Sequence, residues 1–316
     1  MRLYRLPRLV AIAIVVGIGI ATIIWAVTDL HFNDFDSYRL AALRIRDGEQ
    51  LYGGDVTPFN KYYYAPWFAF AFVPLSYLPR DLLALGWSVF TVGCSLIAVW
   101  PLVRHGTVEA WVAAGIFGPT LVALSLSGNI HAPMLAMLVL LLQTRWGPVA
   151  IGVAASLKAT PILLVIAYVG RREWGRASLA IGVAAILWAP VLLFELAPIT
   201  FESGGAALRL ELWFALGAFG ALSALLVTVR WPRFRWLASS VAVFLATPRL
   251  YVYDITILLA ATAKARDNTS RSTDRLRTRD WPGPSSRRGT RQVVPGPDDD
   301  RSQARGDDSS ISGISR

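Results

Sequence analysis

The sequence predicts an all-α polytopic membrane protein with about ten transmembrane helices. Of its 316 residues, 54% are hydrophobic and only 16% are charged, and the mean hydropathy is +0.47. These values are typical of membrane proteins and exclude an ordinary soluble domain. Apolar stretches also recur along the chain, several of them close to the roughly 20 residues that cross a hydrocarbon core.

The first apolar stretch follows a basic segment containing Arg2, Arg5 and Arg8 but has no small-residue cleavage site, so we expect a first span rather than a signal peptide. Stretches that begin near Ala65 and Ile130, and a third near residue 237, are short enough to be re-entrant or tilted. The number of complete crossings is therefore ten to within about two. The ten stretches are residues 9–27, 65–78, 82–103, 108–126, 130–142, 148–169, 177–196, 212–229, 237–246 and 251–263.

Basic residues close to the spans predict the orientation of the chain in a cell membrane. With ten crossings, the N-terminal arginines and the basic groups at 171–176, 230–235 and 264–266 all fall on one side, which is expected to be cytoplasmic. The loop after the first span, the segment 198–209 and the junction 247–253 are then outside. Arg104 and Arg145 also land outside and are exceptions to this count.

The composition changes sharply after Arg266, to Arg, Asp, Ser, Gly and Pro. We expect a transmembrane domain at 1–265 and a disordered cytoplasmic tail at 266–316. The net charge of +10 is carried by span ends and this tail, so membrane lipid is the expected partner rather than nucleic acid. The single cysteine, Cys94, allows no disulfide within one chain, and no residue spacing implies a metal or another cofactor.

The loop between Asp29 and Tyr64 is too polar to be buried in a membrane, yet it keeps partial helical spacing up to Gly48. This pattern predicts an amphipathic helix on the outer interface. Asp34 stands just before this helix and could simply cap its N–H groups. Neighbouring aromatic rings could also desolvate its carboxylate and raise its pKa toward the range of a general base.

Several motifs follow one another in order along the chain. The early ones are Asp34-Phe35, Tyr38, Ala41, Gly48, Tyr52, Tyr64-Ala65-Pro66 and a Pro74-Leu75 turn. Later in the chain, Lys158 lies in a Lys-x-x-Pro-type span, and Asp254 ends a Pro-x4-Tyr-Asp-type segment. Together these motifs resemble the polyprenol-phosphate-mannose-dependent transferases of glycosyltransferase family 87, whose members usually have Gln at the position of Asn129.

The resemblance implies a membrane transferase of the GT-C architecture. Its donor would be a polyprenyl-phosphate hexose reached from the outer leaflet, with mannose implied by the family and glucose or arabinose as alternatives. The acceptor would be a lipid or a glycan. In such enzymes an acidic residue of the first outer loop activates the acceptor hydroxyl; this role falls on Asp34, with Asp36 in reserve. No nucleotide-binding domain is needed, and the sequence has no Gly-rich phosphate loop.

Lys158 lies near the middle of the 148–169 stretch, where a charge costs roughly 2.5–3.5 kcal/mol on insertion scales. We expect it to contact the donor phosphate or a partner carboxylate, unless it pairs with a backbone carbonyl or snorkels. Arg249 is a second phosphate-binding candidate, or else an interfacial anchor. Asp254 could neutralise either cation or contact sugar hydroxyls.

Tyr38, Tyr64 and Asn129 complete the predicted substrate-binding residues, together with Asp254. Asn129 and His131 could line the same cavity as Asp34 if the two apolar stretches that flank them are re-entrant. If both stretches cross, this pair lies on the cytoplasmic side and cannot meet Asp34. For His131 we therefore expect a loop position.

The main alternative function is a secondary transporter with Lys158 and Asp254 at an intramembrane substrate or ion site. A non-catalytic lipid-binding or scaffold protein is a third possibility, in which Asp34 only caps a helix. The concentration of polar and aromatic residues in one long outer loop favours the transferase over the transporter.

Overall fold

The computed structural model describes residues 17, 20, 24, 33–52, 62–105, 107–194, 206–207, 210–247, 249–250 and 252–262. All of them lie in the first of the two units into which the chain divides, Met1–Thr269 and Ser270–Arg316. The expected first span at 9–27 lies almost wholly outside the described residues, and so does the predicted tail at 266–316.

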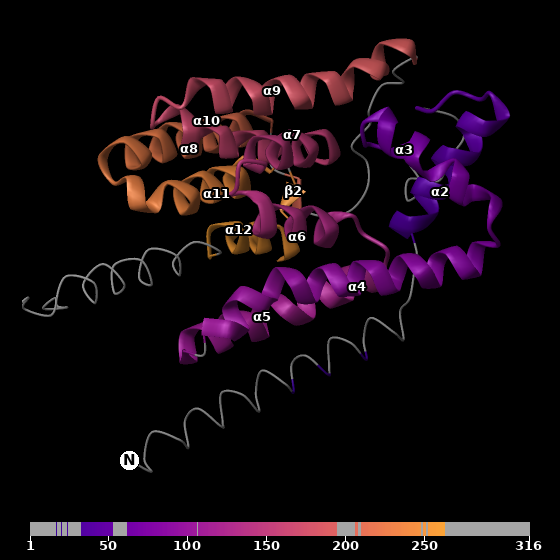
Figure 1. The fold of residues 1–316 in the computed structure, drawn as a ribbon, viewed down its shortest axis with the longest axis horizontal. Helices are drawn as coiled ribbons and strands as arrows, with labels where there is room; N and C mark the ends of the chain where they lie inside the picture. Colours follow the sequence, from indigo (N-terminus) through magenta and orange to yellow (C-terminus); the bar gives the residue numbers. More distant parts are fainter. Residues whose placement is uncertain are drawn as a thin grey trace, which may run out of the picture. The chain divides into compact units, whose positions relative to one another are not determined.

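The described part of the chain is almost entirely helical, as predicted (Figure 1). The structure also contains one short antiparallel pair of strands that was not predicted, in which Ala206 pairs with Leu250 and Ala207 pairs with Arg249. The elements are α2 (Asn33–Asp47), α3 (Pro66–Phe72), η2 (Pro74–Tyr77), α4 (Arg80–His105), α5 (Val108–Leu126), α6 (His131–Leu141), α7 (Gly147–Leu157), η3 (Thr160–Val165), α8 (Ile166–Val169), α9 (Trp174–Trp188), η4 (Ala189–Leu193), β1 (Ala206–Ala207), α10 (Leu210–Arg230), η5 (Pro232–Phe234), α11 (Arg235–Leu245), β2 (Arg249–Leu250), η6 (Val252–Leu258) and α12 (Leu259–Thr262).

Four of the described helical segments are long and apolar enough to cross a membrane, judged by length and composition. They are Arg80–Arg104, Glu109–Leu126, Trp174–Leu193 and Leu212–Arg230. The apolar helices His131–Leu141, Gly147–Leu157 and Thr160–Val169 are shorter. The chain is therefore a polytopic membrane protein in which long helices alternate with short apolar ones.

Helix α2 is the helix predicted for the first outer loop. Asp34 and Asp36 lie in its first turn, and Arg44 and Arg46 lie in its last turn, which suits the helix dipole. It ends at Gly48, whose φ of +75° is the left-handed conformation favoured for glycine after a helix. The backbone N–H of Glu49 donates to the Arg44 carbonyl at 2.8 Å and completes this cap. Phe35, Tyr38 and Ala42 are fully buried, so one face of α2 packs into the protein.

The apolar stretch at 65–78 does not cross the protein. It consists of the short α3 and η2, and both of its ends return to α2. At its start the Tyr64 hydroxyl lies 3.2 Å from the Tyr38 hydroxyl. Just beyond its end the Arg80 guanidinium binds the Asp36 carboxylate at 2.6 and 2.9 Å. The stretch is therefore re-entrant, which is one of the two arrangements expected from its short length.

The stretch at 148–169 was expected to be a complete span, and the structure corrects this expectation. Helix α7 ends at Leu157, and the chain turns back through η3 and α8. The two ends of the hairpin meet, because a Cβ added to Gly147 would lie 2.6 Å from the Tyr168 hydroxyl. Pro161 causes the reversal, since proline at the second position of η3 prevents α7 from continuing.

The first of these two features, the non-crossing stretch at 65–78, changes the predicted sides of Arg104 and Arg145. Helix α4 starts beside α2 and is 26 residues long, about 39 Å at 1.5 Å per residue, so Arg104 lies at the end opposite α2. Next to Arg145, the Thr144 carbonyl accepts a hydrogen bond from Arg176 at 2.8 Å, which puts Arg145 beside the basic group at 171–176. Neither arginine is an exception to the positive-inside pattern, because the non-crossing 65–78 stretch reverses the sides assigned to both.

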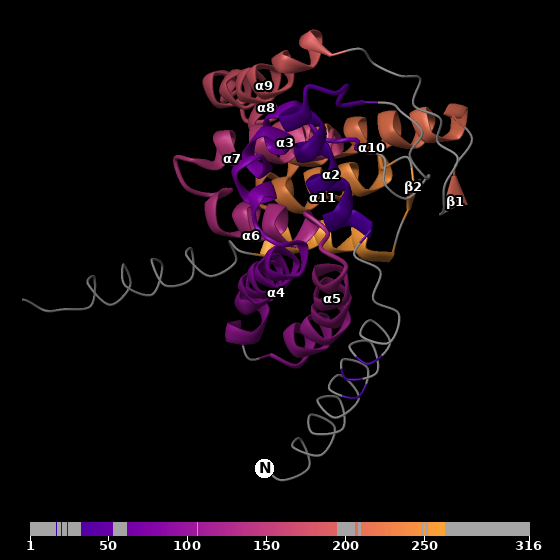
Figure 2. The same cartoon turned by 90° about the vertical axis from the view of Figure 1, so that its right-hand side faces the viewer.

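Helices α4 and α5 form an antiparallel pair that lies side by side in Figure 2. Buried hydroxyls join them: Ser95 Oγ lies 2.7 Å from Ser125 Oγ, and Thr91 Oγ1 donates to the Ser125 carbonyl at 2.9 Å. Small polar residues of this kind hold helices together where lipid supplies no hydrophobic driving force. The pair carries the α5–α6 turn back to α2.

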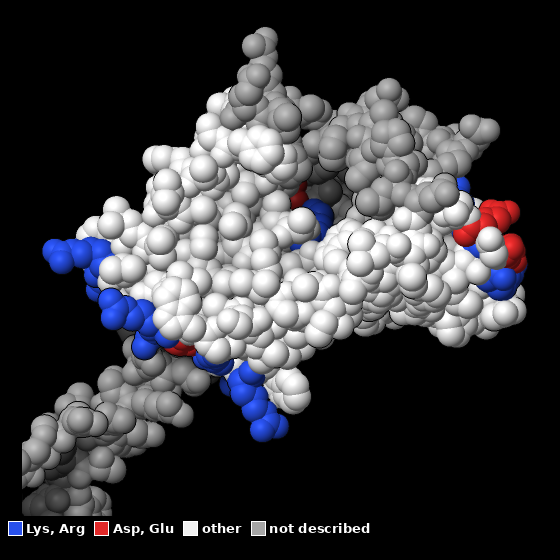
Figure 3. All heavy atoms as spheres, turned by 90° about the horizontal axis from the view of Figure 1, so that it is seen from above, with Lys and Arg blue, Asp and Glu red and all other residues white. Residues whose placement is uncertain are grey.

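Figure 3 shows that charged side chains gather at two edges of the face it presents, with an uncharged band between them. A recess within this band shows basic and acidic atoms. A wide uncharged band between charged edges is the pattern expected of a surface that contacts lipid chains.

The corrected sides can be tested with single cysteines in a chain whose own buried Cys94 is replaced by alanine. Cysteines at positions 104, 145 and 172 are expected to react with a membrane-impermeant maleimide from one face of the membrane. A cysteine replacing Asp81, whose side chain is 96% exposed at the α2 end of α4, should react only from the other face. Reaction of positions 104 and 145 from the face of position 81 would contradict the arrangement.

Candidate active site

Asp34 is the second residue of α2, and the α5–α6 turn reaches its carboxylate. Asn129 Nδ2 donates a hydrogen bond to Asp34 Oδ2 at 2.9 Å. Asn129 Oδ1 accepts a hydrogen bond from the backbone N–H of His131 at 2.8 Å. The Asn129 amide is therefore held at both ends, and its side chain is buried. Two segments that are 95 residues apart in the chain meet at this carboxylate.

Gly128 allows the turn to approach α2 this closely. Its φ of +83° lies in the left-handed region, which side chains other than glycine rarely adopt. A Cβ at this position would lie 2.5 Å from the Phe35 Cβ. Its carbonyl accepts a hydrogen bond from Trp87 Nε1 at 2.7 Å, which attaches the turn to α4 as well.

Tyr38 fixes the same turn from the next turn of α2. Its hydroxyl accepts a hydrogen bond from the Ile130 backbone N–H at 3.1 Å and lies 3.2 Å from the Tyr64 hydroxyl. The Tyr38 ring is fully buried and makes edge contacts with Phe68 and Trp87, at centroid distances of 5.0 and 6.1 Å. Tyr38 is thus part of the wall behind Asp34, whereas Tyr64 is half-buried.

Lys158 lies at the tip of the α7–η3 hairpin in an extended conformation. Its Nζ donates to Asp254 Oδ1 at 3.0 Å, and the two side chains are 25% and 5% exposed. A carboxylate was one of the partners expected for Lys158, and it is the partner found in the structure. Pairing is what allows a charge to persist inside an apolar protein.

His131 was expected to be a loop residue, and this expectation is wrong. It is the first residue of α6 and is buried, and its Nε2 lies 2.8 Å from the Thr256 hydroxyl. The reason is the reversed side of the α5–α6 turn, which places it next to Asp34 although α5 crosses. Element η6 carries both Asp254 and Thr256, so it contacts the hairpin tip and the start of α6 together. His131, Lys158 and Asp254 are also among the residues that line one small recess, as is Thr247.

Burial raises the pKa of the Asp34 carboxyl above its ordinary value. The hydrogen bond from Asn129 and the positive charge of Lys158 act in the opposite direction and lower this pKa. Burial also raises the pKa values of the Tyr38 and Tyr64 hydroxyls, and the charge of Asp34 adds to both shifts, so these hydroxyls stay neutral. The site thus combines a desolvated carboxylate, neutral hydroxyls and a nearby ammonium group.

Asp36 and Arg249 are placed differently from these residues. Asp36 is bound in a two-point ion pair by Arg80, outside the Asn129 contact. The backbone of Arg249 lies in β2, opposite Ala207. Its side chain lies outside what the structure describes.

Within the described ranges, no group of three or more His, Cys, Asp or Glu side chains is placed to hold a metal ion. The polar groups around Asp34 are an amide, hydroxyls and an ammonium group.

The fold and this site define a membrane protein with a desolvated carboxylate at one end of its helices. Residues 62–201, somewhat under half of the chain, match the model of glycosyltransferase family 87, which confirms the resemblance seen in the sequence. Asn129 and Lys158 lie within the matched segment, and Asp34 and Asp254 lie outside it. No curated protein and no solved structure matches the chain.

Several residues that build the site were missed from the sequence. Arg80 is 44 positions from Asp36 and carries no local signal of its partner. Thr256 reads as an ordinary residue of an apolar stretch. A hydrogen-bonding role for Trp87 could have been predicted, because a tryptophan N–H inside an apolar helix needs an acceptor.

Replacing Gly128 with alanine is expected to destabilise the protein and to displace Asn129 from Asp34. The left-handed backbone alone costs about 1–2 kcal/mol for a residue with a Cβ, and overlap with Phe35 adds to this. Gly93→Ala in α4 is the matched control, because nothing lies within 4 Å of a Cβ there. We expect a lower thermal unfolding midpoint in detergent for Gly128→Ala and an unchanged or higher one for Gly93→Ala. Equal midpoints for the two variants would show that the turn does not need glycine.

Proposed function

We propose that the protein transfers a hexose, mannose in the first instance, from a polyprenyl-phosphate donor to a hydroxyl of a lipid or glycan acceptor. Transfer would take place on the extracytoplasmic face. The observation that carries this proposal is the Asp34 carboxylate, desolvated by burial, held by Asn129 and within the electrostatic influence of Lys158. The family match supports the glycosyl-transfer chemistry.

Asp34 is the proposed general base. An acceptor hydroxyl gives up its proton as its oxygen attacks the anomeric carbon, and a carboxylate with a raised pKa can take that proton. Asn129 keeps the carboxylate in one orientation and acts as a positioning residue. Asp36 is the weaker candidate, because its charge is already neutralised by Arg80.

Lys158 is the proposed contact of the departing phosphate. As the new bond forms between acceptor oxygen and anomeric carbon, the bond from that carbon to the phosphate oxygen breaks and leaves a lipid phosphate. A cation near this oxygen stabilises the developing charge. The Lys158 side chain is 25% exposed, which leaves room for a phosphate oxygen to approach, and Asp254 positions it.

The remaining predicted residues take supporting roles in this proposal. Tyr64 is half-buried beside Tyr38 and could meet the substrate, whereas Tyr38 supports the wall behind the carboxylate. Arg249 remains a proposed second phosphate contact on β2.

Lys158 and Asp254 would also serve a transporter as an ion or substrate site, and a scaffold protein would use Asp34 only as a cap. The family match favours the transferase over both. A cap role also fails to account for the Asn129 amide, which donates its own hydrogen bond to the carboxylate that would cap the helix.

Asp34→Asn is expected to abolish transfer from labelled polyprenyl-phosphate-mannose in membranes that contain the chain. Asparagine keeps the size of the side chain but cannot accept the proton, so the rate should fall by about 100-fold or more, the usual contribution of a general base. The measurement is the initial rate of label transfer at equal protein abundance.

Asp36→Asn is the matched control, because it makes the same change two residues away in the same helix. It should keep the rate within a few-fold, since the ion pair it removes is partly exposed and contributes at most about 1 kcal/mol. Loss of activity in Asp36→Asn with retention in Asp34→Asn would exchange the two assignments.

Asn129→Leu is expected to shift the pH profile of transfer. Asp34 works as a carboxylate, so the rate falls as the pH drops through the pKa of Asp34. The Asn129 hydrogen bond lowers that pKa, and its removal should raise the pKa and move the acid side of the profile to higher pH. Initial rates across a pH series measure the displacement.

Ser37→Ala is the control for this pH shift. Its hydroxyl donates to the backbone carbonyl of Asp34 at 2.7 Å without touching the carboxylate, so the profile should stay in place. A uniform loss of rate in Asn129→Leu, with no displacement along the pH axis, would mean that Asn129 does not tune the base.

A further inference from the structure

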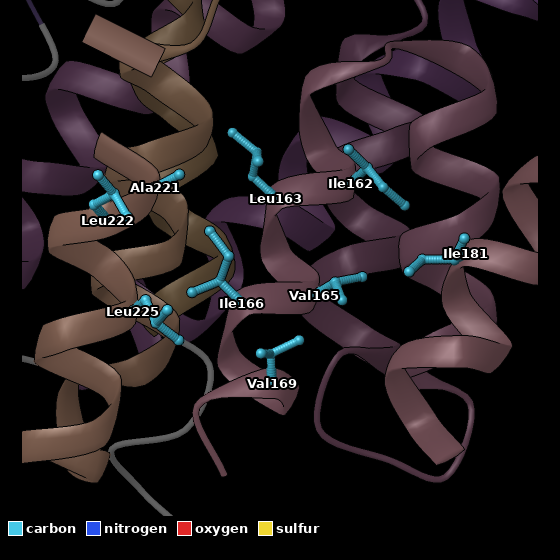
Figure 4. A pocket seen from close by; sticks show the side chains of 9 residues that line it. All are labelled: Ile162, Leu163, Val165, Ile166, Val169, Ile181, Ala221, Leu222 and Leu225. Carbon is cyan, nitrogen blue, oxygen red and sulfur yellow. The ribbon is translucent and has the colours of Figure 1, made fainter. Parts of the chain in front are cut away.

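An apolar groove that shares no lining residue with the recess at Lys158 lies between the η3–α8 segment and helices α9 and α10 (Figure 4). It holds a volume of about 310 Å³ and is lined entirely by aliphatic side chains. On its α9 and α10 walls the side chains of Ile181 and Leu222 are 52% and 68% exposed, so the groove is open to its surroundings. The lining residues are Ile162, Leu163, Val165, Ile166, Val169, Ile181, Ala221, Leu222 and Leu225.

One end of this groove meets a dense group of positive charges, called here the basic rim. The segments 170–176 and 230–236 contain six arginines and one glutamate, a net charge of +5. The glutamate, Glu173, pairs with three of the arginines at 3.1–3.3 Å and holds the two segments together. The rim arginines are Arg171, Arg172, Arg176, Arg230, Arg233 and Arg235.

The basic rim and the groove are continuous along all three walls. Val169 lines the groove and Arg171 follows two residues later. On α10 and α9, five residues separate Leu225 from Arg230 and Ile181 from Arg176, about 7 Å along a helix. The walls close at this end, because a Cβ on Gly170 would overlap the Thr228 methyl group.

Arg172 is an independent sign that positive charge has a use here. It has a φ of +58° in the turn that ends α8, and it is the one described residue other than glycine with a positive φ. The backbone N–H of Glu173 donates to the Tyr168 carbonyl, and that of Arg172 to the Val169 carbonyl, a helix cap in which glycine is usual at the left-handed position. Arginine keeps a charge at the cost of a strained backbone.

We propose that the groove and the basic rim together bind an anionic phospholipid. One acyl chain would occupy the aliphatic groove, and the phosphodiester would lie on the rim, where arginine forks can each engage two phosphate oxygens. The rim is at the end opposite α2, predicted to be cytoplasmic, and the inner leaflet is where anionic lipid attracts basic residues. This site is separate from sugar transfer and does not depend on the function proposed above.

The experiment compares phosphatidylglycerol with phosphatidylcholine, titrated into the purified full-length chain in a neutral detergent. The midpoint of thermal unfolding reports binding, because a ligand that binds only the folded state raises it. We expect phosphatidylglycerol to raise the midpoint more than phosphatidylcholine of the same acyl composition. Loss of one rim arginine should raise the half-saturating phosphatidylglycerol concentration about fivefold.

Three variants separate the site from general charge effects. Arg230→Gln removes a rim charge, and Arg104→Gln makes the same change at the far end of α4, outside the rim, and should have no effect. Arg172→Gly removes a rim charge while suiting the left-handed backbone, so it should weaken the phosphatidylglycerol response in a chain that folds at least as well.

The proposal is overturned by equal responses of the wild-type chain to the two lipids. It is also overturned if Arg104→Gln weakens the phosphatidylglycerol response as much as Arg230→Gln does, which would indicate attraction to net charge alone. A phosphatidylglycerol response in Arg172→Gly equal to that of the wild-type chain would also overturn the proposal, because it would show that the basic rim does not bind the lipid.

Discussion

The hydrogen bond between Asn129 and Asp34 is the contact on which the rest of the site depends. It joins the first turn of α2 to the α5–α6 turn, two segments that no short-range interaction would bring together. The bond exists only because Gly128 has no side chain to collide with Phe35. Once this approach is made, the Tyr38 hydroxyl accepts a hydrogen bond from the Ile130 N–H, and Trp87 Nε1 donates one to the Gly128 carbonyl of the same turn.

The ion pair of Lys158 and Asp254 lies close to the Asn129–Asp34 contact and affects it. Lys158 and Asp254 form a pair whose net charge is zero, and the lysine also moderates the pKa of Asp34. A single buried carboxylate would tend to protonate, and a single buried ammonium group would tend to lose its proton. The ion pair between Lys158 and Asp254 therefore lowers the cost of placing both charges inside the protein.

Features that local chemistry decides could be predicted from the sequence. Features that depend on where the chain reverses its direction could not. Composition sufficed for the helical membrane fold, and Gly48 correctly marked the end of α2. Hydropathy could not tell a span from a hairpin at 148–169, because both bury the same aliphatic residues. The same ambiguity at 65–78 changed the expected sides, and with them the prediction that Asn129 could meet Asp34 only if its flanking stretches were re-entrant. The partner of Asp36 was equally out of reach, since Arg80 comes near it only through the fold.

The reversal at Lys158 leaves the backbone of α7 with carbonyls that no following helical turn can use. The carbonyl of Ser156 is satisfied from outside the hairpin, by the backbone N–H of Ala65 at 3.2 Å. Trp67 Nε1 donates to the Ser156 hydroxyl at 2.9 Å beside it. Lifting this segment would strand a buried acceptor, at a cost on the order of 1–3 kcal/mol. The start of α3 is therefore held against the end of α7, next to the reversal at Lys158, by a backbone and a side-chain hydrogen bond together.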